Sequence, residues 1–330
     1  MTNRAAVLHA PRDVRVEERP VPEPGPLDVL VEIAAVGVCG SDVHYYEHGR
    51  INTRVVRAPH VLGHESAGRV VAVGDRVTQQ AVGDRVALEP GLPCGRCREC
   101  RGGRYNLCRD VRFLGAPPTD GAFTCFVAMH EDFAHALPDS VSDEAGALME
   151  PLSVALWACE KAGVSAGDRV LVTGAGPIGL LVLQVARTRG ATEVAVTDVN
   201  PHRLELARRL GATAEVGEAD ALIECSGHPQ ALRDGIAALR PAGVAVLVGM
   251  GGDGEATVPI ALLQTREIWL TGTFRYANTY PAAIALAAAG RVDLEAIVTG
   301  HFTLDEVDAA LRASREDPHS VKPIVIPLDG

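Results

Sequence analysis

The stretch from Asp168 to Asp198 reads DRVLVTGAGPIGLLVLQVARTRGATEVAVTD, and it decides the fold. An apolar run, RVLVT, is followed by a glycine-rich turn, an apolar helical segment and a second apolar run, EVAVTD. Strand, turn, helix and strand in that order form a βαβ unit, whose two strands lie parallel in one sheet. The sequence therefore predicts an α/β fold built on a doubly wound parallel sheet.

The turn inside this stretch has the spacing of a dinucleotide site, with Gly174, Gly176 and Gly179 in the pattern G-x-G-x-x-G. The first glycine permits a tight turn, the second lets the backbone approach a pyrophosphate, and the third lets helix and strand pack closely. Asp198 ends the second strand, where a carboxylate can accept hydrogen bonds from ribose hydroxyls. Because that charge would repel a 2′-phosphate, NAD is expected rather than NADP. A glycine turn that binds nothing is the alternative, and the placement of the acid disfavours it.

The first half of the chain has a different character. Short segments rich in valine and bounded by glycine turns are typical of strands, and they lie at 28–39, 67–74 and 83–90. Helical periodicity is scarce before about residue 150, which predicts an irregular β-rich domain. We expect this β-rich domain to comprise residues 1–151 and 273–330, and a nucleotide-binding domain to comprise residues 152–272.

The nucleotide-binding domain is expected to be shortened between residues 212 and 221. A helix predicted to end at Gly211 is followed by only nine residues, Ala212 to Asp220, before the next strand, ALIECSG. In a doubly wound sheet the third strand lies at one edge and the fourth crosses to the other half. At about 3.3 Å per extended residue, so few residues cannot form a full strand, return and cross. We therefore predict a stunted third strand without its crossover helix.

The overall composition excludes several classes of function. The chain has 330 residues, a net charge of −11 and 4% aromatic residues, so neither basic patches nor stacking platforms for nucleic acid are expected. No run of eighteen apolar residues is present, which predicts no membrane span. The first residues lack the apolar core of a secretory signal, and a cytoplasmic location is expected.

Half of the eight cysteines fall within CGRCRECRGGRYNLC, at Cys94, Cys97, Cys100 and Cys108. In a reducing compartment such clustered cysteines are expected to bind metal rather than to form disulfides. Four thiolates suit tetrahedral zinc and leave no open position, so this site is predicted to be structural. An iron–sulfur cluster or a redox function is the competing interpretation, although the spacing is only loosely similar to a ferredoxin run.

A second set of possible metal ligands is dispersed along the chain: Cys39 in VGVCGSDVH, His64 and Glu65 in LGHESAG, and Glu150 in ALMEPLS. Spacing alone does not show that these side chains meet. However, GHESAG followed by VVAVG and GDRV resembles the zinc-containing medium-chain alcohol dehydrogenases. CGSDVHYYEHGR, GALMEPLSVA and FRYANTYPAAI resemble the sorbitol (polyol) dehydrogenase branch of that family, and the resemblance covers almost the whole chain.

This resemblance implies a GroES-like catalytic domain joined to a Rossmann domain, with one catalytic and one structural zinc per subunit. Cys39 and His64 match direct ligands of the catalytic zinc. Glu65 and Glu150 match carboxylates that bind the metal or its water, and which of them binds directly stays open. A carboxylate at residue 150 makes the site harder and more polar, which suits a polyol substrate.

The resemblance also implies roles for residues around the reacting atoms. Ser41 and His44 match a proton relay, and Glu150 is expected to act in catalysis as well as in substrate binding. The other positions that match substrate contacts are Tyr45, Arg275 and Tyr276. The positions expected at the cofactor are Gly174, Gly176, Pro177, Ile178, Gly179, Asp198, Arg203, Val248, Gly249, Met250, Thr273, Phe274 and Arg275.

The function implied is an NAD-dependent zinc polyol dehydrogenase that oxidises a secondary alcohol of the sorbitol, xylitol or L-iditol type to a ketose. A homo-oligomer is expected, with a tetramer favoured over a dimer. A related zinc enzyme for threonine, butanediol or a cyclitol is an alternative. A metal-free quinone or enoyl reductase would lack Cys39 and the GHE stretch, whereas a zinc-stabilised NAD-binding sensor would need no open zinc site.

Overall fold

The computed structural model describes residues 2–57, 59–251 and 255–328, and the chain divides into two compact units. Unit 1 consists of Met1–Glu150, Tyr280–Ala288 and Leu294–Gly330, and unit 2 consists of Pro151–Thr279 and Ala289–Asp293. The sequence-based division placed residues 151, 273–279 and 289–293 in the first domain, whereas in the structure they belong to unit 2. For residues 273–279 the reason is visible at Thr273, whose amide donates to the Leu247 carbonyl at 2.9 Å and keeps this segment on the parallel sheet.

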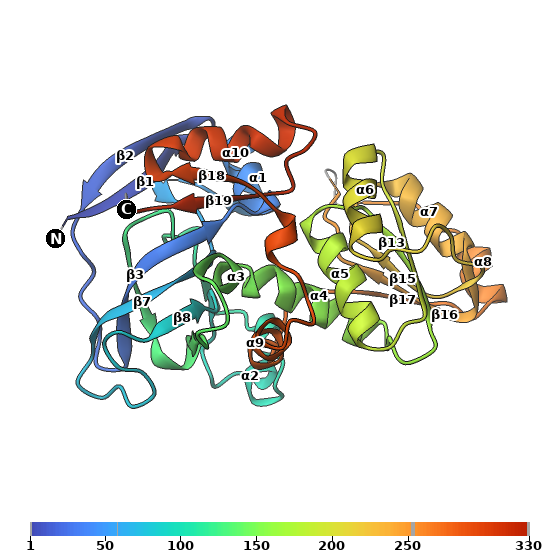
Figure 1. Ribbon diagram of the computed structural model, residues 1–330, viewed down its shortest axis with the longest axis horizontal. Helices are drawn as coiled ribbons and strands as arrows, with labels where there is room; N and C mark the ends of the chain where they lie inside the picture. Colours follow the sequence, from blue (N-terminus) through green and yellow to red (C-terminus); the bar gives the residue numbers. More distant parts are fainter. Residues whose placement is uncertain (1, 58, 252–254, 329–330) are drawn as a thin grey trace. The chain divides into compact units, whose positions relative to one another are not determined.

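Unit 2 is built on a parallel sheet, as the βαβ pattern predicted. Within the described residues the sheet has five strands, which pair in the order β14 (Glu193–Thr197), β13 (Arg169–Thr173), β15 (Ala219–Glu224), β16 (Leu239–Leu247) and β17 (Trp269–Gly272). Figure 1 shows α5 and α6 on one side of these strands and α7 and α8 on the other. The helices of this part of the chain are α4 (Met149–Lys161), α5 (Pro177–Thr188), α6 (Pro201–Arg209), α7 (Pro229–Ala237) and α8 (Ile260–Thr265).

The three helices α5, α6 and α7, which follow β13, β14 and β15, all begin with a proline. The fixed φ of proline suits the first turn of a helix, and its missing N–H needs no partner there. The side chain of Asn200 caps α6 by accepting from the amides of His202 and Arg203. His228 caps α7 by accepting from the Gln230 amide. Each helix therefore starts directly after the carboxyl end of a strand.

The segment between α6 and β15 has no room for a further helix. Residues 210–218 are all described, and none of them is helical. Thr213 alone forms a parallel bridge with Ala195 of β14, and its amide donates to the Val194 carbonyl at 2.8 Å. With this single residue in the place of a third strand, the sheet keeps the 3-2-1-4-5-6 strand order of a doubly wound fold.

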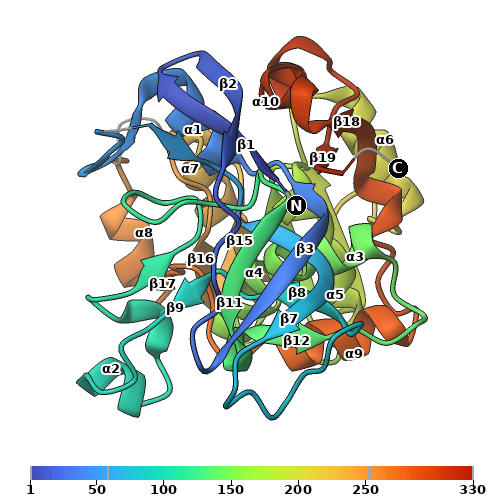
Figure 2. The ribbon, with the colours of Figure 1, turned by 90° about the vertical axis from the view of Figure 1, so that its left-hand side faces the viewer.

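Unit 1 is β-rich and irregular. Its largest sheet has seven strands among the described residues, and Figure 2 shows several of them side by side. They pair in the order β12 (Ala134–Ala136), β8 (Arg85–Leu88), β7 (Glu65–Val73), β3 (Asp28–Gly37), β19 (Lys322–Ile326) and β18 (Val298–Thr303), and β11 (Phe126–His130) also pairs with β3. Register shifts interrupt the β3–β7 pairing, as expected for strands that bend around a core. The predicted combination of a parallel α/β sheet and a separate β-rich domain is confirmed.

Smaller elements complete unit 1. The further strands are β1 (Asn3–Ala10), β2 (Asp13–Arg19), β4 (Arg50–Ile51), β5 (Arg54–Val55), β6 (His60–Val61), β9 (Gly91–Leu92) and β10 (Arg112–Phe113). The α-helices are α1 (Gly40–His48), α2 (Arg98–Arg101), α3 (Asp143–Ala147), α9 (Tyr280–Ala288) and α10 (Val307–Glu316). Short 3₁₀ turns lie at Tyr105–Leu107, Glu131–Phe133, Glu295–Ile297 and Leu304–Glu306.

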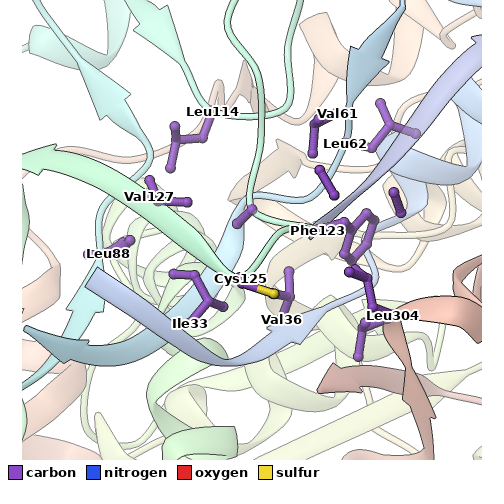
Figure 3. Close-up of a cluster of buried hydrophobic side chains, with 14 of the residues drawn as sticks. Ile33, Val36, Val61, Leu62, Leu88, Leu114, Phe123, Cys125, Val127 and Leu304 are labelled. Carbon is purple, nitrogen blue, oxygen red and sulfur yellow. The ribbon is translucent and has the colours of Figure 1, made fainter. Parts of the chain in front are cut away.

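The core of unit 1 fixes the loop that precedes β7. Phe123, Leu62 and Val36 are buried in this core, which Figure 3 shows together with Leu304. Gly63 has φ +90°, and a Cβ added to it would lie 3.0 Å from the Phe123 ring. A larger residue at Gly63 would therefore be strained and crowded, and the chain would leave the core towards residue 64 along a different path.

The described residues contain no helix that is long and apolar enough to cross a lipid bilayer.

Candidate functional site

The pairing of β3 with β7 brings together three of the four dispersed candidate ligands. Cys39 follows β3 and forms the N-cap of α1, whereas His64 and Glu65 stand at the start of β7. Gly37 and Glu65 are paired in the antiparallel register, so the two ligand segments meet. Ligand atoms of Cys39, His64 and Glu65 all lie within 4.8 Å of one another. This donor set of thiol, imidazole and carboxylate fits an open zinc site, since no fourth ligand atom among the described residues joins the three.

A carboxylate that sequence reasoning missed holds this cluster together. Asp42 is 1% exposed and accepts hydrogen bonds from the backbone amides of Cys39 and Gly63, both at 3.0 Å. Its Oδ1 also lies 3.4 Å from Nδ1 of His64, which leaves Nε2 available as a ligand. Burial opposes the charged form, but His64 and the amides of Cys39 and Gly63 together outweigh that effect and lower the pKa of Asp42. Its position in the sequence could have revealed this role, because Asp42 lies three residues after the N-cap Cys39, where an acidic side chain can complete a capping box.

A buried lysine was also missed. Lys322 begins β19 and is 2% exposed, and its ammonium donates to both oxygens of Glu65 at 2.8 and 2.7 Å and to the Val38 carbonyl at 2.9 Å. Burial would lower the pKa of Lys322, but the hydrogen bonds to Glu65 and the charges of Glu65, Cys39 and Glu150 together outweigh it and raise that pKa. Glu65 is therefore a paired carboxylate, and Lys322 ties the residue before Cys39 to the residue after His64.

Glu150 stands apart from the three that meet. It is buried near the start of α4, and it does not belong to the group of ligand atoms that lie within 4.8 Å of one another. Its charge nevertheless helps to raise the pKa of Lys322. Glu150 is thus an acidic neighbour of the cluster, and its ligand role stays a prediction.

The four clustered cysteines come together as a second candidate metal centre. Ligand atoms of Cys94, Cys97, Cys100 and Cys108 lie within 4.8 Å of one another, and none of them forms a disulfide with another described cysteine. The amides of Arg96 and Cys97 are the main reason why the pKa of Cys94 falls to about 7. Four thiols that converge from one short segment fit a closed tetrahedral site for zinc.

A buried acid joins this cysteine segment to the large sheet. Glu89 is 3% exposed and accepts from the Tyr105 hydroxyl at 2.7 Å. His135 of β12 lies 2.9 Å from the other oxygen of Glu89, and its ring stacks on Tyr280 with centroids 4.8 Å apart. The segment is therefore anchored through its side chains as well as through the candidate metal site.

The proposed relay residues lie on α1. Ser41 and His44 are half-buried, and Tyr45 is 4% exposed. Burial lowers the pKa of His44, and the neighbouring His48 and Arg315 lower it further. The His44 and His48 rings stand 5.7 Å apart. Near neutral pH, His44 is therefore a neutral imidazole that can accept a proton.

The glycine turn of unit 2 has the conformation that its spacing predicted. Gly174 has φ +92°, and a Cβ on Gly179 would lie 1.8 Å from the Gly174 carbonyl oxygen. A Cβ on Gly176 would meet no atom within 4 Å, so the backbone is open to a ligand at this point. Asp198 accepts from the Ala175 amide at 2.6 Å and from the Asn200 amide at 2.8 Å, and thus braces the turn. The open backbone beside a carboxylate fits a dinucleotide.

The remaining candidate cofactor residues follow other strands at the same edge of the sheet. The amides of Val248 and Gly249 donate to the Glu224 carbonyl at 2.8 and 2.9 Å, and Met250 is exposed. Pro177 and Ile178 open α5, and Arg203 lies on α6.

Residues 273–276 follow β17. Thr273 is bonded to Leu247, Phe274 is exposed, and the Arg275 guanidinium lies 4.8 Å from the centre of the Phe274 ring. Tyr276 is 3% exposed, and the Arg275 backbone has φ +53°. Parallel sheets bind ligands at this carboxyl edge, which is where the structure gathers these residues.

Comparisons with known proteins agree with this geometry. The profile of the alcohol dehydrogenase GroES-like domain matches residues 25–139, and that of the glucose dehydrogenase C-terminus matches residues 143–325. The sorbitol dehydrogenase of Bacillus subtilis is 42% identical over 342 residues, which covers 98% of this chain and 97% of that protein. The sorbitol dehydrogenase of Mus musculus is also 42% identical and covers 95% of this chain and 93% of its own length.

The solved structures that resemble this chain are also dehydrogenases. L-idonate 5-dehydrogenase of Escherichia coli superposes with a TM-score of 0.93 at 32% identity, covering 99% of each chain. A putative zinc-binding dehydrogenase of Sinorhizobium meliloti bound to NADP has a TM-score of 0.91 at 31% identity and covers 99% of this chain and 100% of that one. A short chain alcohol dehydrogenase of Escherichia coli CFT073 complexed with NADH has a TM-score of 0.90 at 28% identity, with coverage of 99% and 100%.

Proposed function

The chain belongs to the zinc-containing medium-chain alcohol dehydrogenase family, in its sorbitol dehydrogenase branch, and we propose that it transfers hydride from a secondary alcohol of a polyol to NAD, giving a ketose. The observation that carries the proposal is the meeting of Cys39, His64 and Glu65 in a chain that matches sorbitol dehydrogenases over nearly its whole length. A sensor or a structural protein would need no such open ligand set beside its four-cysteine centre.

Two zinc ions per subunit are part of this proposal. Cys39, His64 and Glu65 would hold the catalytic ion, with Glu150 as the further acidic candidate, and the four-cysteine set would hold the structural ion. Zinc bound at the open site supplies Lewis acidity, which eases loss of a proton from a hydroxyl group. Asp42 and Lys322 keep His64 and Glu65 in place, so the site is preorganised by this chain's own hydrogen bonds.

The other residues bind, orient and move a proton. We assign His44 the task of taking up the hydroxyl proton by way of Ser41 and releasing it to solvent, and the support is its lowered pKa, which keeps the imidazole neutral. Tyr45, Glu150, Arg275 and Tyr276 are the proposed polyol contacts. Several hydroxyls on one substrate need several polar partners to select a single carbon for oxidation, and this set supplies acceptors, donors and a cation.

NAD is proposed as the preferred nicotinamide cofactor. Solved relatives of this chain hold NADP in one case and NADH in another, so the preference has to come from this chain's own residues. Asp198 follows β14 and is half-buried beside the glycine turn. A carboxylate at that position accepts from ribose hydroxyls and repels a 2′-phosphate.

We also propose a cytoplasmic homo-oligomer, with a tetramer favoured over a dimer. The support is the edge strand β17, which carries Trp269 with 74% of its surface exposed. Ile260 of α8 is 65% exposed in the same unit. Large apolar side chains beside a sheet edge are features of association surfaces.

NADH formation across a panel of polyols, threonine, butanediol and cyclitols tests the proposal. We expect turnover with sorbitol, xylitol or L-iditol, a large preference for NAD over NADP, and loss of activity after chelation that zinc restores. Metal analysis should give two zinc ions per chain. Preference for threonine or butanediol, or turnover that persists once the metal has been removed, would contradict it.

A further inference from the structure

A buried carboxylate outside the predicted sites lies at the carboxyl edge of the parallel sheet. Glu224 ends β15 and is 3% exposed. Its Oε1 accepts from the Ser226 amide at 2.8 Å, from the Gly227 amide at 2.9 Å and from the Thr173 hydroxyl at 3.3 Å. The Ser226 hydroxyl also donates to this oxygen. No lysine or arginine among the described residues forms an ion pair with Glu224, so backbone amides and hydroxyls alone compensate its charge.

The main chain of the same residue binds the next loop. The Glu224 carbonyl accepts from the amides of Val248 and Gly249 at 2.8 and 2.9 Å. Thr173 is the residue before the glycine turn, and Val248 opens the second proposed cofactor stretch. Glu224 therefore contacts the ends of β13 and β16 as well as the loop that follows its own strand.

Residues 225–227, which we call the β15 loop, are the surface against which both cofactor stretches pack. A Cβ on Gly174 would lie 2.9 Å from the Ser226 nitrogen, and a Cβ on Gly249 would lie 2.2 Å from the Gly227 nitrogen. Gly227 itself has φ +68°. Neither glycine therefore has room for a side chain against the backbone of the β15 loop, and a shift of this loop would displace the turn at Gly174 and the stretch at Gly249 together.

We propose that Glu224 is a positioning residue for the nicotinamide cofactor: by holding the β15 loop, it fixes the spacing between the Gly174–Gly179 turn and the Val248–Met250 stretch. This inference rests on the proposed function. The four groups that face Oε1 are all donors, and a carboxylate accepts from them more strongly than an amide does. The exposed Ser226 side chain leaves the outer side of the loop open to a ligand.

The same strand supplies a matched control at its other end. Asp220 accepts from the Arg169 amide at 2.8 Å and forms an ion pair with Arg240. Like Glu224, it joins β15 to its neighbour β13 through a carboxylate, but at the amino edge of the sheet. Asp220→Asn should therefore lower the stability of unit 2 without changing its affinity for the cofactor.

The test is the dissociation constant for NADH, measured by fluorescence titration on the wild-type protein, Glu224→Gln and Asp220→Asn, with the thermal unfolding of each. Because a charged hydrogen-bond acceptor is lost, we expect Glu224→Gln to weaken NADH binding on the order of tenfold. KM for NAD should rise, while KM for the polyol and the zinc content stay unchanged. Asp220→Asn should bind NADH as the wild type does, even where its melting temperature falls.

The outcomes separate the two proposals. Failure of the wild-type protein to bind NADH would overturn the proposed function itself. Two other outcomes would overturn only the inference about Glu224. In the first, Glu224→Gln binds NADH as tightly as the wild type does. In the second, Glu224→Gln and Asp220→Asn lose the same amount of NADH affinity. Should Glu224→Gln not fold, Ser226→Ala removes one of the four donors at an exposed side chain, and it should still raise the NADH dissociation constant several-fold. An unchanged constant in Ser226→Ala would then reject the inference.

Discussion

The buried pair of Lys322 and Glu65 carries a specific energetic consequence. Both side chains are almost fully buried, at 2% and 1% exposure, so neither charge can turn to water when its partner is lost. Breaking such a pair costs about 3–5 kcal/mol, whereas replacing both partners by neutral groups is far less costly. The pair is therefore a strong constraint on the two ligand segments, although its net contribution to stability is small.

Lys322→Met and Glu65→Gln should each destabilise unit 1 by about 3–5 kcal/mol, and the double variant should be more stable than either single one. Urea unfolding of the three variants measures these free energies. Lys161→Met is the control, since Lys161 lies at the end of α4 with its ammonium 5.5 Å from the centre of the Trp157 ring, and its loss should cost about 0.5–1 kcal/mol. A double variant no more stable than the single ones would show that the two charges are not coupled.

The lowered pKa of His44 predicts the pH dependence of turnover. As the pH falls, His44 becomes protonated and can no longer accept a proton, so kcat/KM should decrease. Since the pKa lies below the ordinary value of 6.5, the acidic limb of the profile should also lie below pH 6.5. His48→Gln removes a neighbouring imidazole that lowers this pKa, and it should move the limb towards 6.5. A limb that does not move in His48→Gln would exclude His44 as the titrating group.

At the scale of elements, the pairing of β3 with β7 is what makes the candidate metal centre. Gly37 faces Glu65 across this pairing, and a Cβ on Gly37 would lie 2.1 Å from Glu65 Oε2. Gly40, the first residue of α1, has no atom within 4 Å of such a Cβ. Two glycines on either side of Cys39 therefore differ sharply in the space around them.

Gly37→Ala should displace the Glu65 carboxylate, lower stability by about 1–3 kcal/mol and reduce zinc binding at this centre. Gly40→Ala should be neutral or slightly stabilising, because alanine restricts the unfolded chain and has room in the folded one. Chemical unfolding measures the stability of both variants, and metal analysis measures how much zinc each of them binds. Equal effects of the two substitutions would mean that the contact with Glu65 does not constrain the site.

Local patterns predicted some elements well and missed others for a physical reason. The βαβ unit at residues 168–198 was predictable because its strands, turn and helix adjoin in sequence, and the stunted third strand followed from a count of nine residues. Lys322 and Asp42 were not predictable in this way. Lys322 reaches Glu65 only because β19 pairs with β3, a long-range contact that no local pattern encodes. Glu224 was hidden for the same reason, since its partners lie after other strands.

At the scale of the whole molecule, the chain divides into two units with different tasks. Unit 1 holds both candidate metal centres, and unit 2 holds the glycine turn and its carboxylate. The two candidate metal centres differ in openness: four cysteines would leave no free position on a bound ion, whereas Cys39, His64 and Glu65 would leave room for a further ligand. We therefore propose that the four-cysteine centre stabilises the fold and that the centre at Cys39, His64 and Glu65 is catalytic.

Cys97→Ser should remove the structural zinc and lower the melting temperature, because a structural zinc site contributes directly to folding. At a temperature where the variant is still folded, its turnover per catalytic zinc should stay close to that of the wild type. Differential scanning calorimetry with metal analysis makes this comparison. A variant that keeps two zinc ions per chain would show that Cys97 is not a ligand.

The most direct test of the central claim is the rate of NADH formation from a polyol in Cys39→Ser, with the bound zinc counted on the same sample. We expect one zinc ion per chain in place of two, a nearly unchanged melting temperature and loss of NADH formation by several orders of magnitude. Turnover close to that of the wild type, or retention of both zinc ions, would contradict the assignment of Cys39, His64 and Glu65 as the catalytic centre.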